Sequence, residues 1–341
     1  MTTSIESPLP AQGADEKAAP AGAFEALKTR IKAHYDICSG YYLNLWGQHI
    51  HHGYWTEETS HLSKEDAQVA LIELLLTRAG FRGADAPSSE KKLRILDVGC
   101  GVGGTTRYLA KNLGWEATGV TISDEQVKIA YDLSRKDASE PTENGTAHST
   151  GGGGRVSLGT LGGSVEFIPL DAEKMGDYFA SHDQLGSFDV VWISEALSHF
   201  PNKQLFFENA YKLLRSGGKL VLADWFKGED LTEKQFQDDI VPIEDGMLLP
   251  PLETEAGYVK LAQAAGFQSR KDAEGKDFMD ISKNVARTWD ITSDLITSPS
   301  LWAFALSQGR DVVLFLKAFA AMRRGFANST FLYAVMAFEK K

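Results

Sequence analysis

The sequence predicts an α/β fold built on a parallel sheet of the nucleotide-binding type, and three observations lead to this prediction. Residues 93–126 have the pattern of a strand, a glycine-rich turn, a helix and a second strand, which is one half of such a sheet. Apolar runs and helical periods alternate along most of the remaining chain. The run at 188–194 is almost continuously apolar, as a parallel strand covered on both faces requires.

The turn of this unit has the sequence DVGCGVGG, at residues 97–104. Glycine lets a ligand approach the main chain and tolerates a positive φ, and Gly99, Gly101 and Gly103 are spaced to supply both properties. A dinucleotide fingerprint would need GxGxxG and an acidic residue that closes the second strand. The second strand ends without such an acid. The pattern therefore argues against NAD.

The turn, with Asp97 at its start, resembles motif I of the class I S-adenosylmethionine-dependent methyltransferases. The resemblance implies S-adenosyl-L-methionine as the cofactor, with the turn lying against its methionine and ribose part. A carboxylate at Asp97 could then act on the ammonium end of the ligand, often through water. The alternative is an ordinary strand–turn–helix corner that binds nothing.

Composition limits the classes of protein to consider. A chain of 341 residues is long enough for one large α/β domain, or for one domain with a cap. A formal net charge of −11 argues against broad attraction to nucleic acid or to anionic membranes. Two cysteines, Cys38 and Cys100, predict a reducing compartment without a disulfide framework, and no run of about 18 apolar residues could span a bilayer. Without a signal or transit pattern, we expect a cytoplasmic protein.

The chain divides into three expected parts. Residues 1–22 are rich in Ala, Pro, Ser and Gly, which predicts a disordered tail. Residues 23–90 carry helical spacing at 24–32 and a second segment from 34, and they are too few for a core of their own. We expect them to form a helical lid over the cofactor edge. Residues 91–341 form the expected cofactor-binding domain, with a flexible Gly-rich surface insertion at 139–163.

Strands and helices alternate within this domain. Strands are expected at 93–96, 116–121, 165–170, 188–194, 219–225, from 267 and at 331–338. Helices are expected at 105–113, from 126 to about 138, at 202–214, at 254–265 and, with a break near 308–309, at 289–322. This order, with a final return strand, matches the Rossmann-like seven-stranded sheet of the methyltransferases.

Polar residues that follow the predicted strands are the expected cofactor ligands, because open parallel sheets bind ligands at that edge. A carboxylate at Asp171 could accept a hydrogen bond from the amine of adenine, although the same residue would also cap a short helix. The family resemblance, more than the chemistry, places the ribose at the end of the second strand. The expected cofactor-binding residues are Asp97, Gly99, Gly101, Gly103, Thr121, Ile122, Ser123, Gln126, Asp171, Ala172, Ser194 and Tyr54.

Glu195 and His199 follow the fourth strand at the same edge. If the segment turns helically, their four-residue spacing places them on one face. Methyl transfer needs an aligned acceptor and usually the loss of a proton, so His199 is a candidate base that Glu195 could orient. Tyr35 is a third candidate catalytic residue, from an aromatic set that could face the sulfonium or wall off the acceptor. The alternative is that Glu195 contacts only the cofactor and His199 is a packed polar residue.

The run WGQHIHHGYW at 46–55 has no zinc-binding spacing, so we expect no metal. It resembles the tocopherol C-methyltransferase-like branch, and the glycine turn is similar to that branch and to the sterol C-methyltransferases. SEALSH at 194–199 resembles the same segment of both, with Ser198 replacing an acidic residue of the tocopherol type. The resemblance covers about residues 31–340.

The resemblance implies methyl transfer to carbon or nitrogen of an apolar or aromatic small molecule from secondary or lipid metabolism. Two alternatives stay open, namely an O-methyltransferase of a natural product and a catalytically silent protein that binds S-adenosyl-L-methionine. The expected partner is the small-molecule acceptor, without nucleic acid or integral membrane association, and a homodimer is an open expectation.

Overall fold

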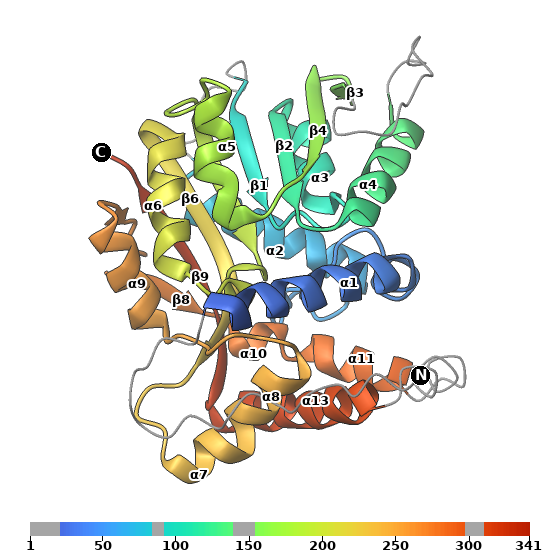
Figure 1. Cartoon of the computed structure of the whole chain (residues 1–341), viewed down its shortest axis with the longest axis vertical. Coiled ribbons are helices and arrows are strands. Elements are labelled where there is room, and N and C mark those ends of the chain that lie inside the picture. Colours follow the sequence, from blue (N-terminus) through green and yellow to red (C-terminus); the bar gives the residue numbers. More distant parts are fainter. Residues whose placement is uncertain (1–20, 84–91, 139–153, 297–309) are drawn as a thin grey trace.

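The computed structural model of the protein describes residues 21–83, 92–138, 154–296 and 310–341. Within these ranges the strands form one nine-stranded sheet in the order β3-β4-β2-β1-β5-β6-β9-β7, with β8 also paired to β9 (Figure 1). The strands are β1 Arg94–Val98, β2 Glu116–Thr121, β3 Val156–Leu158, β4 Gly163–Pro169, β5 Phe188–Ser194, β6 Leu214–Lys227, β7 Gln268–Ser269, β8 Phe278–Asp280 and β9 Phe331–Glu339.

The predicted α/β class is confirmed, but the predicted number of seven strands is too low. Omitting β3 and β8, which have three residues each, leaves seven strands. Five of these, β4, β2, β1, β5 and β6, run parallel, and β9 returns antiparallel to β6 along nine paired residues. The carboxyl ends of the five parallel strands therefore meet at one edge of the sheet.

Helices cover both faces of the sheet. The helices are α1 Ala21–Trp46, α2 Lys64–Arg78, α3 Gly104–Leu113, α4 Asp124–Lys136, α5 Met175–Ser181, α6 Lys203–Leu213, α7 Glu233–Gln235, α8 Val241–Gly246, α9 Glu255–Ala264, α10 Ser282–Val285, α11 Arg287–Ile296 and α13 Arg310–Asn328. Short helical turns lie at Ala172–Lys174 and Leu197–His199, and a π-helix lies at Phe236–Ile240. None of the helices in the described ranges is long and apolar enough to span a bilayer.

The central strand β5 shows why the sheet needs two helical layers. Val190 and Trp192 belong to a buried cluster with α2, α3 and α4, whereas Val191 and Ile193 belong to one with α5, α6 and α9. Successive side chains of a strand point to opposite faces, so an apolar strand is stable only when both faces are covered. The same arrangement leaves the strand ends uncovered by these layers.

Residues 21–46 form one long helix, α1, rather than the two predicted segments, because α1 continues through residues 33 and 34. In Figure 1, α1 crosses the end of the sheet at which β1, β2 and β4 finish, and it packs against α4. The loop after it is fixed by Gln68 of α2, whose Nε2 donates to the carbonyl oxygens of His49 and His51 at 2.5 and 3.0 Å. Helix α1 thus has a defined position across the strand ends, where the sequence analysis expected a lid.

Several predicted segments fall partly outside the described residues. These are the tail at 1–20, residues 84–91 of the lid and 139–153 of the insertion, and the predicted break in the last helical segment. In the described part of the insertion, β3 pairs with β4, which begins at the insertion's last residue, Gly163. The segment 233–246, which carried no prediction, forms α7, the π-helix and α8, and it packs against α13.

Candidate functional site

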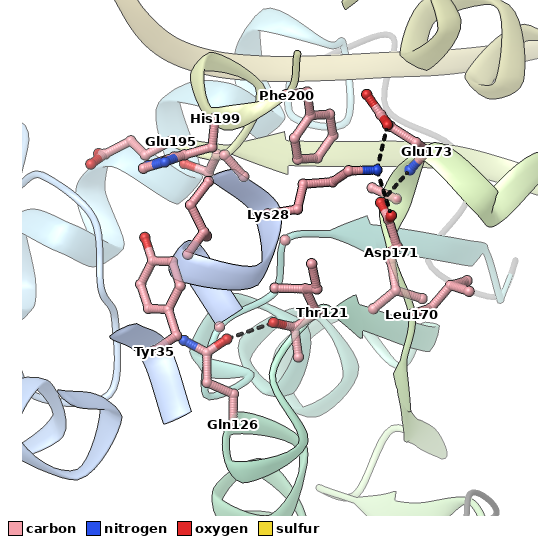
Figure 2. Close-up of a pocket in the computed structure, with 18 of the residues that line it drawn as sticks. Lys28, Tyr35, Thr121, Gln126, Leu170, Asp171, Glu173, Glu195, His199 and Phe200 are labelled. Atoms are coloured by element: carbon pink, nitrogen blue, oxygen red, sulfur yellow. Dashed lines mark hydrogen bonds and ion pairs between the residues drawn. The ribbon is translucent and has the colours of Figure 1, made fainter. Parts of the chain in front are cut away.

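A cleft opens at the carboxyl ends of the parallel strands, between the sheet and α1 (Figure 2). Its volume is about 840 Å³, including the open mouth. Most of the predicted site residues line it, namely Tyr35, Gly99, Gly101, Thr121, Ile122, Gln126, Asp171, Ala172, Ser194, Glu195 and His199. The remaining predicted residues, Asp97, Gly103, Ser123 and Tyr54, lie outside this lining.

The three glycines of the turn have different surroundings, although all have a positive φ, of 71° at Gly99, 55° at Gly101 and 76° at Gly103. A Cβ on Gly99 would lie 2.4 Å from the Cβ of Ala196, and one on Gly103 would lie 2.5 Å from the ring of Phe167. A Cβ on Gly101 would meet no heavy atom within 4 Å. Gly101 therefore presents bare main chain to open space, whereas Gly103 permits close packing.

Asp97 lies behind the turn, with its side chain 3% exposed. The carboxylate accepts a hydrogen bond of 2.6 Å from Thr106 Oγ1, at the start of α3. Burial raises the pKa of Asp97 to about 7, although the hydrogen bonds from Thr106 oppose that rise. A positive charge nearby would favour the ionised form of Asp97. A cationic ligand bound at the turn would therefore lower the pKa of this carboxyl group.

The end of β2 supplies neutral hydrogen-bonding groups. Thr121 Oγ1 donates to Gln126 Oε1 at 2.5 Å, and both residues line the cleft (Figure 2). Ser123 is fully buried and caps α4, because its Oγ accepts a hydrogen bond from the Gln126 N–H. The same Oγ donates to Asp36 Oδ1 on α1 at 2.6 Å. Ser123 thus ties the lid to the end of the strand.

Asp171 is held by α1. Lys28 Nζ donates to Asp171 Oδ2 at 3.1 Å and to Glu173 Oε2 at 2.9 Å, as Figure 2 shows. Burial acts to lower the pKa of Lys28, but hydrogen bonds to Glu173, Glu25 and Asp171 raise it well above its usual range. The other oxygen of Asp171 accepts from the Glu173 N–H, so the alternative prediction of a helix cap is confirmed.

Glu195 does not share a helical face with His199, because its φ of 55° places it in the left-handed region. Its Oε1 accepts from the backbone N–H of His52 and from Tyr333 Oη, both at 2.7 Å, and its Oε2 lies 2.9 Å from His52 Nδ1. Burial alone would raise the pKa of Glu195, but His52, through its charge and hydrogen bonds, lowers it. The predicted pairing of Glu195 with His199 is therefore wrong.

His199 lines the same cleft as Glu195. Its ring centroid is 6.3 Å from that of Tyr35 and 6.3 Å from that of Trp225. The structure thus brings two of the three candidate catalytic residues, Tyr35 and His199, together. Glu195 belongs to a separate network that lines the same cleft.

Three functional groups were missed by sequence reasoning, namely His52, Tyr333 and Lys28. The sequence analysis gave the histidines of the run no role as hydrogen-bond partners. His51 is buried and His49 is half-buried, and loss of hydration lowers the pKa of both, for His49 to about 3. The run also touches the glycine turn, since a Cβ on Gly104 would lie 1.9 Å from the carbonyl oxygen of Gln48. No group of three or more His, Cys, Asp or Glu in the described ranges is arranged to hold a metal.

Tyr54 is half-buried and packs against the apolar cluster on the α2 face, and its N–H donates to the Ala67 carbonyl at 2.8 Å. Burial raises the pKa of its phenol. The next residue, Trp55, is anchored to Asn284 through the Trp55 N–H and carbonyl groups. These contacts fix the loop that carries His52.

Comparisons with known proteins match this chain to methyltransferases. The sequence profile described as "Methyltransferase domain" matches residues 96–222, and that described as "Mycolic acid cyclopropane synthetase" matches residues 25–144. A chloroplastic tocopherol O-methyltransferase of Arabidopsis thaliana is 30% identical over 80% of this chain and 70% of its own length. A 2-methyl-6-phytyl-1,4-hydroquinone methyltransferase of a Synechocystis strain is 33% identical over 54% of this chain and 47% of its own length.

Among solved structures, a cyclopropane synthase from Mycobacterium tuberculosis matches with a TM-score of 0.66 at 18% identity. The match covers 92% of this chain and 98% of that chain, and at this identity it establishes the fold alone. Together with the sequence matches, it shows that the chain belongs to the class I S-adenosylmethionine-dependent methyltransferases, and that it is similar to their tocopherol methyltransferase branch.

Proposed function

We propose that the chain transfers a methyl group from S-adenosyl-L-methionine to carbon or nitrogen of an apolar or aromatic small molecule. The observation that carries the proposal is the open space at Gly101, which shares one cleft with the carboxyl groups of Asp171 and Glu195. The names of the Arabidopsis and Synechocystis relatives, a tocopherol and a phytyl-hydroquinone methyltransferase, support an apolar acceptor.

The groups that line the cleft fit this cofactor. Ile122 and Leu170 offer apolar surface for a base, and Thr121 and Gln126 offer hydroxyl and amide groups for ribose. The exposed main chain at Gly101 allows close approach of a ligand without a side-chain clash. Bound there, S-adenosyl-L-methionine would supply an electrophilic methyl carbon attached to a positively charged sulfur.

Each candidate residue has a proposed role at this site. Glu195 keeps a negative charge beside the cleft, where it stabilises the positive charge of the ligand. His199 and Tyr35 contact the acceptor, and His199 takes up its proton. Asp97 acts on the ammonium end from behind the turn. Gly103, Ser123 and Tyr54 support the site by packing and capping.

Mass spectrometry after incubation with deuterium-labelled S-adenosyl-L-methionine tests the proposal. The acceptors are tocopherol, 2-methyl-6-phytyl-1,4-hydroquinone and, as a polar control, catechol. We expect labelled methyl on an apolar acceptor and none on catechol. Failure of both transfer and cofactor binding would refute the proposal.

Two other outcomes separate the alternatives. Label on oxygen would favour an O-methyltransferase, the activity that the Arabidopsis relative carries in its name. Cofactor binding without transfer to any acceptor would favour a catalytically silent protein. A cytoplasmic location and a homodimer stay predictions, and the chloroplastic name of that relative makes the location worth testing.

A further inference from the structure

Three buried nitrogen atoms belong to His52 and to two indole rings that pack against it, namely Nε2 of His52 and the Nε1 atoms of Trp225 and Trp289. The three side chains are 3%, 6% and 7% exposed, and none of these atoms has a hydrogen-bond partner among the described residues. The ring centroids of Trp225 and Trp289 lie 6.0 and 4.9 Å from that of His52. A buried polar group without a hydrogen-bond partner costs free energy of folding. Three such nitrogen atoms in neighbouring rings therefore indicate a ligand group that would pair with them.

This nitrogen cluster, defined as His52, Trp225 and Trp289, lies behind two residues of the cleft lining. Glu195 lines the cleft and contacts His52 directly, and His199, also in the lining, lies 6.3 Å from Trp225 between ring centroids. The three residues come from three elements, since His52 belongs to the loop after α1, Trp225 to β6 and Trp289 to α11. Only the folded chain brings them together.

The surroundings of the cluster are aromatic. The ring of Tyr333 lies 5.0 Å from that of His52, and the ring of Phe326 lies 6.4 Å from it. Phe326, on α13, is half-buried, so the aromatic region reaches from the cleft wall towards the surface. A ligand group at the nitrogen cluster would therefore need an apolar body around it.

We infer that the nitrogen cluster binds a hydroxyl group of an apolar acceptor, an inference that rests on the proposed function. Indole N–H groups can only donate, so Trp225 and Trp289 require an oxygen that accepts. Nε2 of His52 donates or accepts according to its protonation. His52 Nδ1 faces the Glu195 carboxylate and carries the proton, so Nε2 of the neutral ring accepts. A hydroxyl group accepts two hydrogen bonds and donates one, which matches two indole donors and this acceptor.

Isothermal titration calorimetry with 4-hexylphenol and hexylbenzene tests the inference, because the two probes differ only in the hydroxyl group. Titrations use the full chain saturated with S-adenosylhomocysteine. We expect the phenol to bind more tightly than hexylbenzene, and Trp289→Phe and Trp225→Phe each to weaken the phenol about three- to tenfold, as loss of one hydrogen bond implies. Binding of hexylbenzene should be unchanged in both variants.

Trp192→Phe is the matched control, because it removes an equally buried indole N–H from β5. It should leave the affinity for 4-hexylphenol unchanged. Equal affinities for the two probes, equal losses of both probes in the Trp225 and Trp289 variants, or no phenol binding to the wild-type protein would overturn the inference. The affinity for S-adenosylhomocysteine is measured in every variant, and an unchanged value shows that the variant is folded and that its cofactor site is intact. If the wild-type protein did not bind this product, the proposed function itself would fail.

Discussion

At the scale of single residues, a substitution of Gly101 tests the proposed cofactor site most directly. Its φ of 55° and the open space beside it mean that a side chain there would fill the cleft without disturbing a neighbour. Asn tolerates left-handed backbone better than most residues. Gly101→Asn should therefore lower the affinity for S-adenosylhomocysteine at least tenfold, measured by calorimetry, with a small change in thermal stability.

Gly217 supplies the control for this substitution. It has a φ of 72° and open space around its would-be Cβ, but it lies in β6 outside the cleft lining. Gly217→Asn should leave cofactor affinity unchanged. Equal affinities in the two variants would show that the turn does not contact the cofactor.

Glu255, the first residue of α9, gives a prediction about pH. Its side chain is buried, and burial, followed by the nearby charges of Asp280 and Glu229, raises its pKa to about 7. A raised carboxyl pKa means that the stability this group contributes is full below the unfolded value of 4.5 and is lost as the pH rises through about 7. Glu255→Gln should thus stabilise the protein at pH 8, on the order of 1–3 kcal/mol, and much less at pH 5.

Urea unfolding of the wild-type protein and the Glu255→Gln variant at both pH values measures this difference. Glu58→Gln, at an exposed position, serves as the control and should change stability equally at pH 5 and pH 8. A stabilisation by Glu255→Gln that is the same at both values would contradict the assignment of a buried, protonated carboxyl.

The site residues that the sequence could predict are those encoded by local spacing. Glycines after the first strand, and polar residues after the next strands, fall at the binding edge once the strands are known. The partners of Glu195 could not be predicted this way, because His52 lies 143 residues away and Tyr333 lies 138 residues away in the chain. Their contact depends on how the loop after α1 and strand β9 pack.

At the scale of elements, α1 is fastened to the sheet through ion pairs. The Lys28 side chain is 11% exposed and contacts Asp171 and Glu173, and Lys32 contacts Asp124 at 2.6 Å. Lys28→Met should loosen α1, so amide hydrogen exchange in residues 21–46 should become faster. Because Lys28 occupies Asp171, the variant should also bind S-adenosylhomocysteine at least as tightly as the wild-type protein.

Lys234→Met is a suitable comparison, since Lys234 forms an exposed ion pair with Asp238 within one helical segment. Exchange in residues 21–46 should not respond to it. If exchange in that segment were the same in the Lys28 variant and the wild-type protein, the ion pairs would not be what holds the lid in place.

Elements with a clear period were predicted well, and short or irregular ones were not. The bounds of β2 and β5 agree with the predicted strands at 116–121 and 188–194. β3 and β8 have three residues each, too few to show a pattern of alternation. The π-helix at Phe236–Ile240 departs from the helical period altogether, which explains why 233–246 carried no prediction.

At the scale of the whole molecule, the cleft exists only in the folded chain, because its lining residues come from 28–35 of α1 to 194–201 after β5. A ligand that binds only the folded state stabilises it by mass action. S-adenosylhomocysteine at 100 times its dissociation constant should therefore raise the free energy of unfolding by about 2.7 kcal/mol. Thermal unfolding checks this, and NAD at the same concentration should give no shift.

The central claim is that S-adenosyl-L-methionine binds against the backbone of the glycine turn, where no side chain blocks its approach. A crystal structure with S-adenosylhomocysteine tests it most directly. The account predicts density for the product against Gly101, within the cleft that Asp171 and Glu195 also line. Density for the product at any other place on the protein would contradict it.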